Sequence, residues 1–119
     1  MRIEVRFRAL DASEPLREHV LRAVHFHLSR FGRELSSVSA RIGDVNGPKG
    51  GIDKRCQLHV RGPRIGSLMV AEVSADAYAA VDVCAERAGR SVGRELERLR
   101  TRGDSSPQQR APVDGEPSV

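Results

Sequence analysis

The sequence predicts an α+β fold of two layers, in which two helices cover one face of a four-stranded mixed sheet. Strand-like and helix-like patterns follow one another in the order β-α-β-β-β-α, and each helical pattern has a single apolar stripe. Both stripes need the apolar face of one sheet, so a two-layer sandwich satisfies them together. A chain of 119 residues is long enough for one such domain.

The first strand and the first helix have the clearest patterns. Residues 2–8 alternate between polar and apolar side chains, which puts three apolar residues on one face: Ile3, Val5 and Phe7. Ser13 stands two residues before Pro15, which is typical of a helix start. Apolar residues then recur at helical spacing up to Gly32, where we expect the helix to end: Leu16, Val20, Leu21, Val24, Leu28 and Phe31.

Three more strands are predicted, at residues 37–43, 54–61 and 67–74. The first two of these strands each have one apolar face, formed by Val38, Ala40 and Ile42 and by Cys56, Leu58 and Val60. Both faces of the last strand are apolar, so the sequence leaves its inward face open. The helix before residue 37 favours parallel pairing of the strands on either side of it, whereas the later, shorter connections favour antiparallel pairing.

The last helix is predicted from near Ala75 to about Thr101. Its apolar stripe contains Val81, Cys84, Ala85, Ala88, Val92, Leu96 and Leu99. Gly89 and Gly93 interrupt this helix, and they either permit close packing on the sheet or weaken the helix. Residues 102–119 are rich in Pro, Ser, Gln and Gly, so we expect a domain of residues 1–101 followed by a disordered polar tail.

Composition narrows the classes of function. The net charge is +4 and the pI about 9.8, and arginine dominates the 20 cationic residues, which favours a phosphate-bearing partner. Aromatic residues make up only 3%, so the core must consist mainly of Val, Leu, Ile and Ala. No apolar run could span a bilayer, and the charged N-terminus is unlike an export signal. With two cysteines and no disulfide framework, we expect a cytoplasmic protein.

The last helix carries the strongest candidate for a binding surface. Four arginines follow one another at about one per turn, opposite the apolar stripe: Arg87, Arg90, Arg94 and Arg98. Such a row can follow a nucleic-acid backbone. The alternative is a solvated helix face, on which neighbouring glutamates pair with the arginines: Glu86, Glu95 and Glu97.

The first helix adds three arginines on its polar side and beyond: Arg22, Arg30 and Arg33. Phe26 falls between the first two of them, away from the apolar stripe. It either stacks on a splayed RNA base or packs against a neighbouring element at the edge of the core.

A glycine-rich loop and the uncovered side of the sheet give weaker signals. The segment Asn46–Gly51 places three glycines next to Lys49, Lys54 and Arg55, so it either holds a phosphate or is only a flexible connection. It lacks the spacing of a nucleotide-binding P-loop. The uncovered sheet face is basic as well, although such a face must be polar in any case: Arg6, Arg8, Arg41, Arg55 and Arg61.

No pattern points to catalysis or to metal binding. The histidines lack metal-ligand spacing, neither cysteine has a CxxC partner, and no serine lies in a nucleophile elbow. We therefore expect no enzyme, no metal and no cofactor. Cys56 and Cys84 lie on apolar faces, which favours inert core thiols.

Two short segments resemble a known family. The segment Asp76–Asp82, D-A-Y-A-A-V-D, resembles the D-x-Y-A-A-I-D signature of the ribosome hibernation-promoting factor and ribosome-associated inhibitor A family, here in its short form. Residues 16–20, L-R-E-H-V, resemble the family pattern L-R-x-x-V. The resemblance spans about residues 1–100, and the family has the same order of elements. The N-G-P-K-G-G loop is not in the best-known members and looks like the mark of a divergent branch.

The resemblance implies a hibernation factor that binds ribosomal RNA of the small subunit near the decoding region and sterically blocks tRNA and mRNA. It also implies RNA contacts through Arg22, Arg87, Arg90 and Arg94. Gly93 stands where the family usually has a basic residue. Long members carry a second domain that pairs two ribosomes, so we expect no ribosome dimerisation from this chain.

Two other functions stay open. The family has been linked to modulation of a sigma factor, which would make the chain a protein-interaction module for an acidic partner. Two helices on a sheet also suit a general structured-RNA-binding domain. The first hypothesis is a monomeric, non-enzymatic translation inhibitor involved in stress response, whose partner is the small ribosomal subunit rather than a membrane or a small-molecule substrate.

Overall fold

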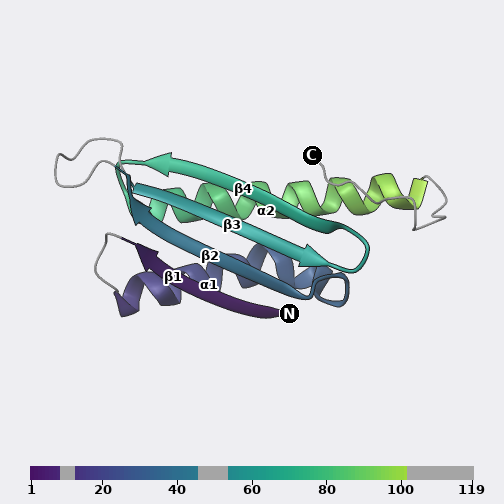
Figure 1. The fold of residues 1–119 in the computed structure, drawn as a ribbon, viewed down its shortest axis with the longest axis horizontal. Helices are drawn as coiled ribbons and strands as arrows, with labels where there is room; N and C mark the ends of the chain where they lie inside the picture. The colour runs from purple at the N-terminus through teal and green to yellow at the C-terminus, as the bar shows by residue number, and fades with distance from the viewer. Residues whose placement is uncertain (9–12, 46–53, 102–119) are drawn as a thin grey trace.

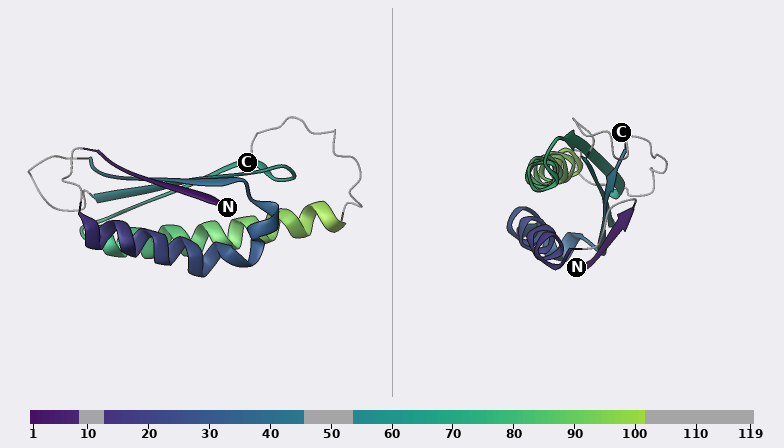
Figure 2. Two further views of the ribbon diagram at one scale, coloured as in Figure 1. Left: turned by 90° about the horizontal axis from the view of Figure 1, so that it is seen from below. Right: turned by 90° about the vertical axis from the view of Figure 1, so that its left-hand side faces the viewer.

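The computed structural model describes residues 1–8, 13–45 and 54–101, and the predicted tail and the Asn46–Gly51 loop lie outside these residues. The element order confirms the predicted fold class (Figure 1). In chain order, the elements are β1 Arg2–Arg8, α1 Glu14–Leu28, η1 Ser29–Glu34, β2 Ser37–Asp44, β3 Lys54–Gly62, β4 Gly66–Ser74 and α2 Ala77–Thr101. Figure 2 shows both helices on the same face of the sheet.

The sheet has the strand order β1-β2-β3-β4, with β1 and β2 parallel and the other two pairs antiparallel, as predicted. One row of paired residues crosses all four strands under the helices: Val5, Ala40, Leu58 and Val70. Each of these residues is buried, so the register aligns the apolar faces of the strands into a single floor for the core.

Helix α1 begins as predicted but ends earlier. The Ser13 hydroxyl accepts a hydrogen bond from the Leu16 backbone N–H at 3.2 Å, which caps the helix. The α-helix ends at Leu28, and the chain continues as the 3₁₀ segment η1 rather than as α-helix up to Gly32. The tighter winding keeps Phe31 packed against the core and leads to the buried Leu35 just before β2.

The structure decides which face of β4 points inward. Val70 lies opposite Leu58 and is buried, whereas Met69 and Val73 are 56% and 45% exposed. The β3–β4 hairpin closes at Gly66, which has a φ of +73° that suits glycine. The apolar residues at 69, 71 and 73 therefore lie on the side of the sheet away from the helices.

Helix α2 begins at Ala77, two residues later than predicted, because Asp76 caps it. The Asp76 carboxylate accepts a hydrogen bond from the Tyr78 backbone N–H at 3.0 Å, and its carbonyl accepts one from Ala80 at 3.0 Å. The predicted stripe is buried from Val81 to Val92, and Leu96 packs partly against the core.

The two glycines of α2 face the other helix rather than the sheet. A Cβ at Gly89 would lie 2.9 Å from the His27 carbonyl oxygen, and a Cβ at Gly93 would lie 3.3 Å from the Phe31 ring. The prediction of close packing is therefore right, but its partner is α1 and η1. Gly89 is the tighter position, because a backbone atom cannot move aside as a ring can.

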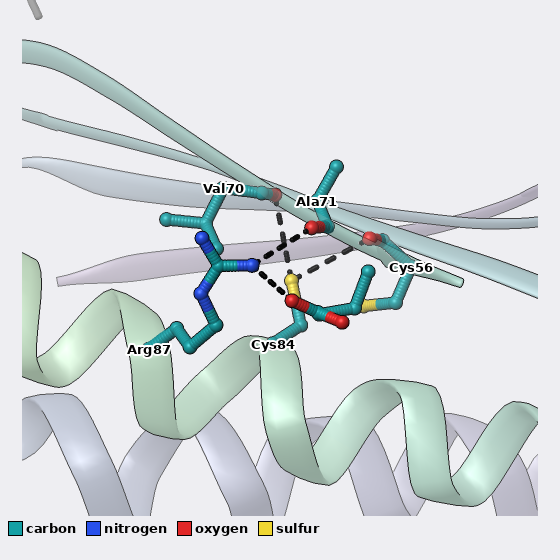
Figure 3. A network of polar contacts seen from close by, with 6 residues as sticks. Cys56, Val70, Ala71, Cys84 and Arg87 are labelled. Carbon is teal, nitrogen blue, oxygen red and sulfur yellow. Dashed lines mark hydrogen bonds and ion pairs between the residues drawn. The ribbon is translucent and has the colours of Figure 1, made fainter. Parts of the chain in front are cut away.

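The core consists of aliphatic side chains and two thiols, as the scarcity of aromatics predicts. Its largest fully buried side chains are those of Leu28, Ile42 and Leu58. The Cys84 thiol donates to the carbonyls of Val70 and Cys56 at 3.4 and 3.5 Å (Figure 3). The side-chain hydrogen bond with Cys84, together with burial, raises the pKa of the Cys56 thiol, so this thiol stays protonated. Within the described residues, no helix is long and apolar enough to cross a membrane.

Candidate nucleic-acid interface

The four predicted arginines of α2 are all exposed: Arg87, Arg90, Arg94 and Arg98. They lie outside the buried stripe of this helix. We call the exposed surface of α1, η1 and α2 the helix face. Arg87 lies at its edge, where α2 meets β4.

Arg87 and Arg98 are engaged within the protein. One guanidinium nitrogen of Arg87 contacts the Glu72 carboxylate and also donates to the Ala71 carbonyl at 3.3 Å, both on β4 (Figure 3). Arg98 pairs with Glu95 one turn earlier on the same helix. The hydrogen bond to Glu95 and its charge raise the pKa of Arg98. The alternative prediction, that neighbouring glutamates of α2 pair with the arginines, therefore holds for Arg98. Arg87, at the other end of the row, is paired with Glu72 of β4 instead.

Arg90 and Arg94 are different, because neither has an acidic partner among the described residues. They lie about one turn apart between the two paired arginines, roughly 6 Å along the helix axis. Their guanidinium groups can bind an external phosphate without first leaving a carboxylate.

The first helix brings Arg22 and Phe26 to the same layer. Phe26 is 79% exposed, so packing at the edge of the core is excluded for it. It lines a shallow hollow with an apolar floor between α1 and β1, together with Ile3, Leu21, Arg22 and His25. Its own ring meets His27 edge-on, with ring centroids 4.9 Å apart. An exposed ring beside an arginine provides both a stacking surface and a phosphate contact.

The two arginines of η1 are exposed as well. Arg30 lies over the ring of Phe31, with its guanidinium carbon 4.6 Å from the ring centroid. This cation–π contact fixes the direction of the side chain without neutralising its charge. Arg33 has no acidic partner in the described part of the chain.

The residues predicted around the glycine-rich loop do not join the helix face. Lys49 lies outside the described residues. Lys54 forms an ion pair with Asp44 at 3.6 Å, where β2 ends and β3 begins. Arg55 alternates with the buried Cys56, so it lies on the opposite side of the sheet from the helices. The predicted site residues therefore form at least two separate surfaces.

The D-A-Y-A-A-V-D segment has a structural role that the sequence does not reveal. Asp76 caps α2, while Tyr78 and Asp82 both contact His19 of α1. The His19 Nε2 atom lies 2.7 Å from the Asp82 carboxylate, and the rings of His19 and Tyr78 meet edge-on at 5.0 Å. The segment thus ties the starts of the two helices together, which keeps the arginines of α1 and α2 in one layer.

Sequence reasoning missed the pairing of Arg87 with Glu72, because the two residues lie 15 positions apart on adjacent elements. Only the position of α2 over β4 brings these two side chains together. The alternation of residues 2–8 does place Arg2 on the uncovered side of the sheet, opposite the inward-facing Ile3.

Fold and surface together define a small α+β domain with an arginine-lined helix face, which is typical of a nucleic-acid-binding module. The chain belongs to the family described as Sigma 54 modulation protein / S30EA ribosomal protein, which it matches over residues 3–100. The family expected from the two short motifs is therefore confirmed.

Solved structures agree with this assignment. The fold is similar to that of a ribosomal subunit interface protein from Coxiella burnetii, with a TM-score of 0.67 and 19% identity over 82% of this chain and 99% of that one. It is also similar to the N-terminal domain of Protein Y from Thermus thermophilus, with a TM-score of 0.62 and 26% identity over 79% and 98% of the two chains. No curated protein sequence matches the chain.

Proposed function

We propose that this protein binds the small ribosomal subunit through its helix face and blocks translation by occupying the space that tRNA and mRNA need near the decoding region. The observation that carries the proposal is the pair Arg90 and Arg94, two exposed arginines without acidic partners among the described residues. Membership of a family described as an S30EA ribosomal protein supports a ribosomal partner. The Coxiella burnetii relative in fold is itself described as a ribosomal subunit interface protein.

The proposed contacts are mainly electrostatic. Arginine matches the geometry of a phosphate with two parallel hydrogen bonds, so Arg90 and Arg94 provide the first anchors along α2. Arg22, Arg30 and Arg33 extend the positive surface over α1 and η1. Binding should therefore weaken steeply with salt, because each phosphate contact releases counterions.

Phe26 adds a contact of another kind. Its exposed ring stacks on an unpaired base, while Arg22 on the rim of the same hollow holds the adjacent phosphate. Single-stranded segments of ribosomal RNA offer such bases. This contact gives the helix face a preference for splayed RNA over a regular duplex, and it argues against a general duplex binder.

Arg87 and Arg98 take a secondary part. Each has to leave a carboxylate before it can hold a phosphate, so part of the gain in binding is offset. Lys54 and Arg55, at the start of β3, would add a contact, and so would Lys49 of the glycine-rich loop, which lies outside the described residues. Lys54 is already engaged with Asp44, which makes it a weaker contact than Arg55.

The mechanism requires no chemistry. A domain held rigid by its core acts by occupying space, so we infer a non-enzymatic, monomeric and cytoplasmic hibernation factor of the stress response, without a cofactor. The family description also names sigma 54 modulation, which would use the same basic surface for an acidic protein. Ribosome binding and binding of an acidic protein can be told apart by competition, because free RNA should displace the ribosome from the helix face but should not displace an acidic protein partner.

Co-sedimentation with isolated small ribosomal subunits tests the proposal. The wild type should pellet with the subunits at low salt and remain in the supernatant at high salt. A variant with Arg90→Glu and Arg94→Glu should lose binding even at low salt. A control with Arg17→Glu and Arg64→Glu makes the same change of charge at two exposed arginines that are not among the proposed contacts, and it should keep binding.

Two results would contradict the proposal. If the wild type stays in the supernatant at low salt, the ribosome is not the partner. If both variants bind equally well, the contact surface is not the helix face. Displacement of the wild type by a regular RNA duplex at the same phosphate concentration would favour a general structured-RNA binder instead.

A further inference from the structure

The side of the sheet away from the helices, which we call the open sheet face, is a regular array of side chains. Strand alternation and the register arrange them in four rows across β1 to β4. The rows are Arg2-Ser37-Arg61-Ser67, Glu4-Ser39-His59-Met69, Arg6-Arg41-Gln57-Ala71 and Arg8-Gly43-Arg55-Val73. Figure 2 shows no helix on this side.

This face is strongly positive. It carries six exposed arginines against one carboxylate, that of Glu4: Arg2, Arg6, Arg8, Arg41, Arg55 and Arg61. The only ion pair on it within the described residues joins Glu4 to Arg6 at a long 4.0 Å. The other five arginines have no acidic partner in the parts of the chain that the structure describes.

Two of these arginines lie directly opposite each other. Arg6 on β1 pairs with Arg41 on β2 in the parallel register, and the residue that follows Arg41 across β3 is the neutral Gln57. Like charges at opposed positions of a sheet destabilise it. Arg6 and Arg41 also line a shallow hollow with Glu4 and Ser39. An anion in this hollow would remove the repulsion between the two guanidinium groups.

The pKa of His59 reflects the positive charge of this face. Partial burial and the charges of Arg61 and Arg41 lower its pKa. Its ring nitrogen Nε2 contacts the Ser67 hydroxyl on β4, and β4 brings no charged group toward it on this face. The nearest carboxylate in its row is that of Glu4, two strands away. The imidazole is therefore a natural probe for an anion that binds between these arginines.

We propose that the open sheet face is a second RNA-binding surface, which holds the phosphate backbone of a single strand across β1, β2 and β3. The inference rests on the proposal that the chain binds RNA, and it adds a second RNA segment on the side opposite the helix face. The protein would then lie between two RNA segments, anchored on both sides.

Three features favour an RNA backbone over an acidic protein. Uncharged polar residues lie between the arginines: the hydroxyls of Ser37 and Ser39 can donate to phosphate oxygens, and so can the amide of Gln57, which also donates to the Met69 sulfur. The exposed apolar residues of the face, Met69 and Val73, are confined to the β4 edge, so β1 to β3 offer no apolar centre for a protein interface. The arginines of this face are spread over β1, β2 and β3, so a backbone that crosses these strands meets a positive charge on each of them.

No Phe, Tyr or Trp lies among these outward residues, and the one imidazole, that of His59, contacts the Ser67 hydroxyl. We therefore expect this face to recognise phosphate charge and not base identity. The helix face, with Phe26, would determine which RNA site is bound. The open sheet face would add affinity for the RNA backbone on its own side, independent of sequence.

The test uses the full chain and an oligouridylate of about ten nucleotides, a usual site size for a single domain. NMR would follow the His59 imidazole and the arginine side chains. We expect the RNA to raise the pKa of His59 and to shift the side-chain signals of Arg6, Arg41 and Arg55. In a variant with Arg90→Gln and Arg94→Gln these shifts should persist, because that variant changes only the helix face.

A second variant, with Arg6→Gln, Arg41→Gln and Arg55→Gln, should bind one oligouridylate where the wild type binds two. Its salt slope should fall by about 2, since each single-strand phosphate contact contributes about 0.7. The variant should fold, because it removes opposed like charges rather than core contacts. Circular dichroism checks this before binding is measured.

Unchanged His59 and arginine signals on addition of RNA would overturn the inference, and ribosome binding that depends on Arg90 and Arg94 would still stand. Shifts at His59 without any binding to small ribosomal subunits would keep the inference and overturn the proposed function. An oligoglutamate of equal charge that shifts these signals at lower concentration than the RNA would assign the face to an acidic protein, which also overturns the inference.

Discussion

The helix face and the open sheet face are both lined with arginine, but their charges are organised differently. On α2, the spacing of the helix places glutamates three residues before Arg98 and Arg100, so these arginines are paired within their own element. On a strand, a partner can come from two residues away or from the neighbouring strand. The first gives only the long Glu4–Arg6 pair, and the register offers mostly Ser, Gly and Gln for the second. The open sheet face, which gives the weaker signal in the sequence, is therefore more uniformly positive in the fold than the helix face.

A count of arginines is therefore a poor guide to a binding surface. What matters is how many of the guanidinium groups have a carboxylate within reach, and this depends on the spacing of the element and on its neighbours.

The first prediction compares unpaired and paired arginines on one helix. Replacing Arg90 and Arg94 with Gln should weaken binding to small ribosomal subunits about 10- to 100-fold, or about 1.4 to 2.7 kcal/mol. Replacing Arg98 and Arg100 with Gln makes the same change of net charge, but both are ion-paired, and the loss should stay below about threefold. Equal losses in a salt titration of both variants would mean that internal pairing does not decide which arginines bind.

The second prediction concerns the feature that only the helix face has. Phe26→Ala should reduce affinity for single-stranded RNA by about 1 to 3 kcal/mol, the usual value of one stacked base. The melting temperature should not change, because the ring is 79% exposed and contributes little to the core. Phe26→Tyr is the matched control and should bind like the wild type. A drop in melting temperature without loss of affinity would mean that the ring is structural.

The third prediction uses the contact between the helices, on which the helix face depends and the open sheet face does not. Gly89→Ala should destabilise the fold by about 1 to 2 kcal/mol, because the Cβ would lie 2.9 Å from a backbone oxygen of α1. Gly93→Ala should be neutral or stabilising by up to about 1 kcal/mol, since it gains helix propensity and meets only a movable ring. Chemical denaturation measures both, and the reverse order would contradict the packing described for α1 and α2.

The smallest effect is a pH dependence that originates on the open sheet face. Because the folded state lowers the pKa of His59, the folded protein binds fewer protons there than the unfolded chain does. Stability should therefore be highest above the ordinary histidine pKa and should fall as the pH drops below about 6.5. His59→Gln should flatten this part of the stability profile. An unchanged slope would place its origin in another histidine.

The sequence by itself determined the class of fold and most of the elements, because these follow from local periodicity. The alternation in residues 2–8, the cap at Ser13 and the arginine row of α2 all depend on neighbours within one or two turns. The family also followed from a local motif at Asp76–Asp82, although the reason for that motif is tertiary: two of its side chains hold His19 of the other helix.

Tertiary structure decided what local spacing leaves open. It chose the inward face of β4, because only pairing with Leu58 buries Val70, and it assigned the glycines of α2 to the contact with α1. It also separated Arg55 from the helix arginines and paired Arg87 with Glu72, since both outcomes depend on which elements lie side by side. Charge is fixed by sequence, but whether a charge is available to a partner is fixed by the distance to its nearest counter-charge in the fold.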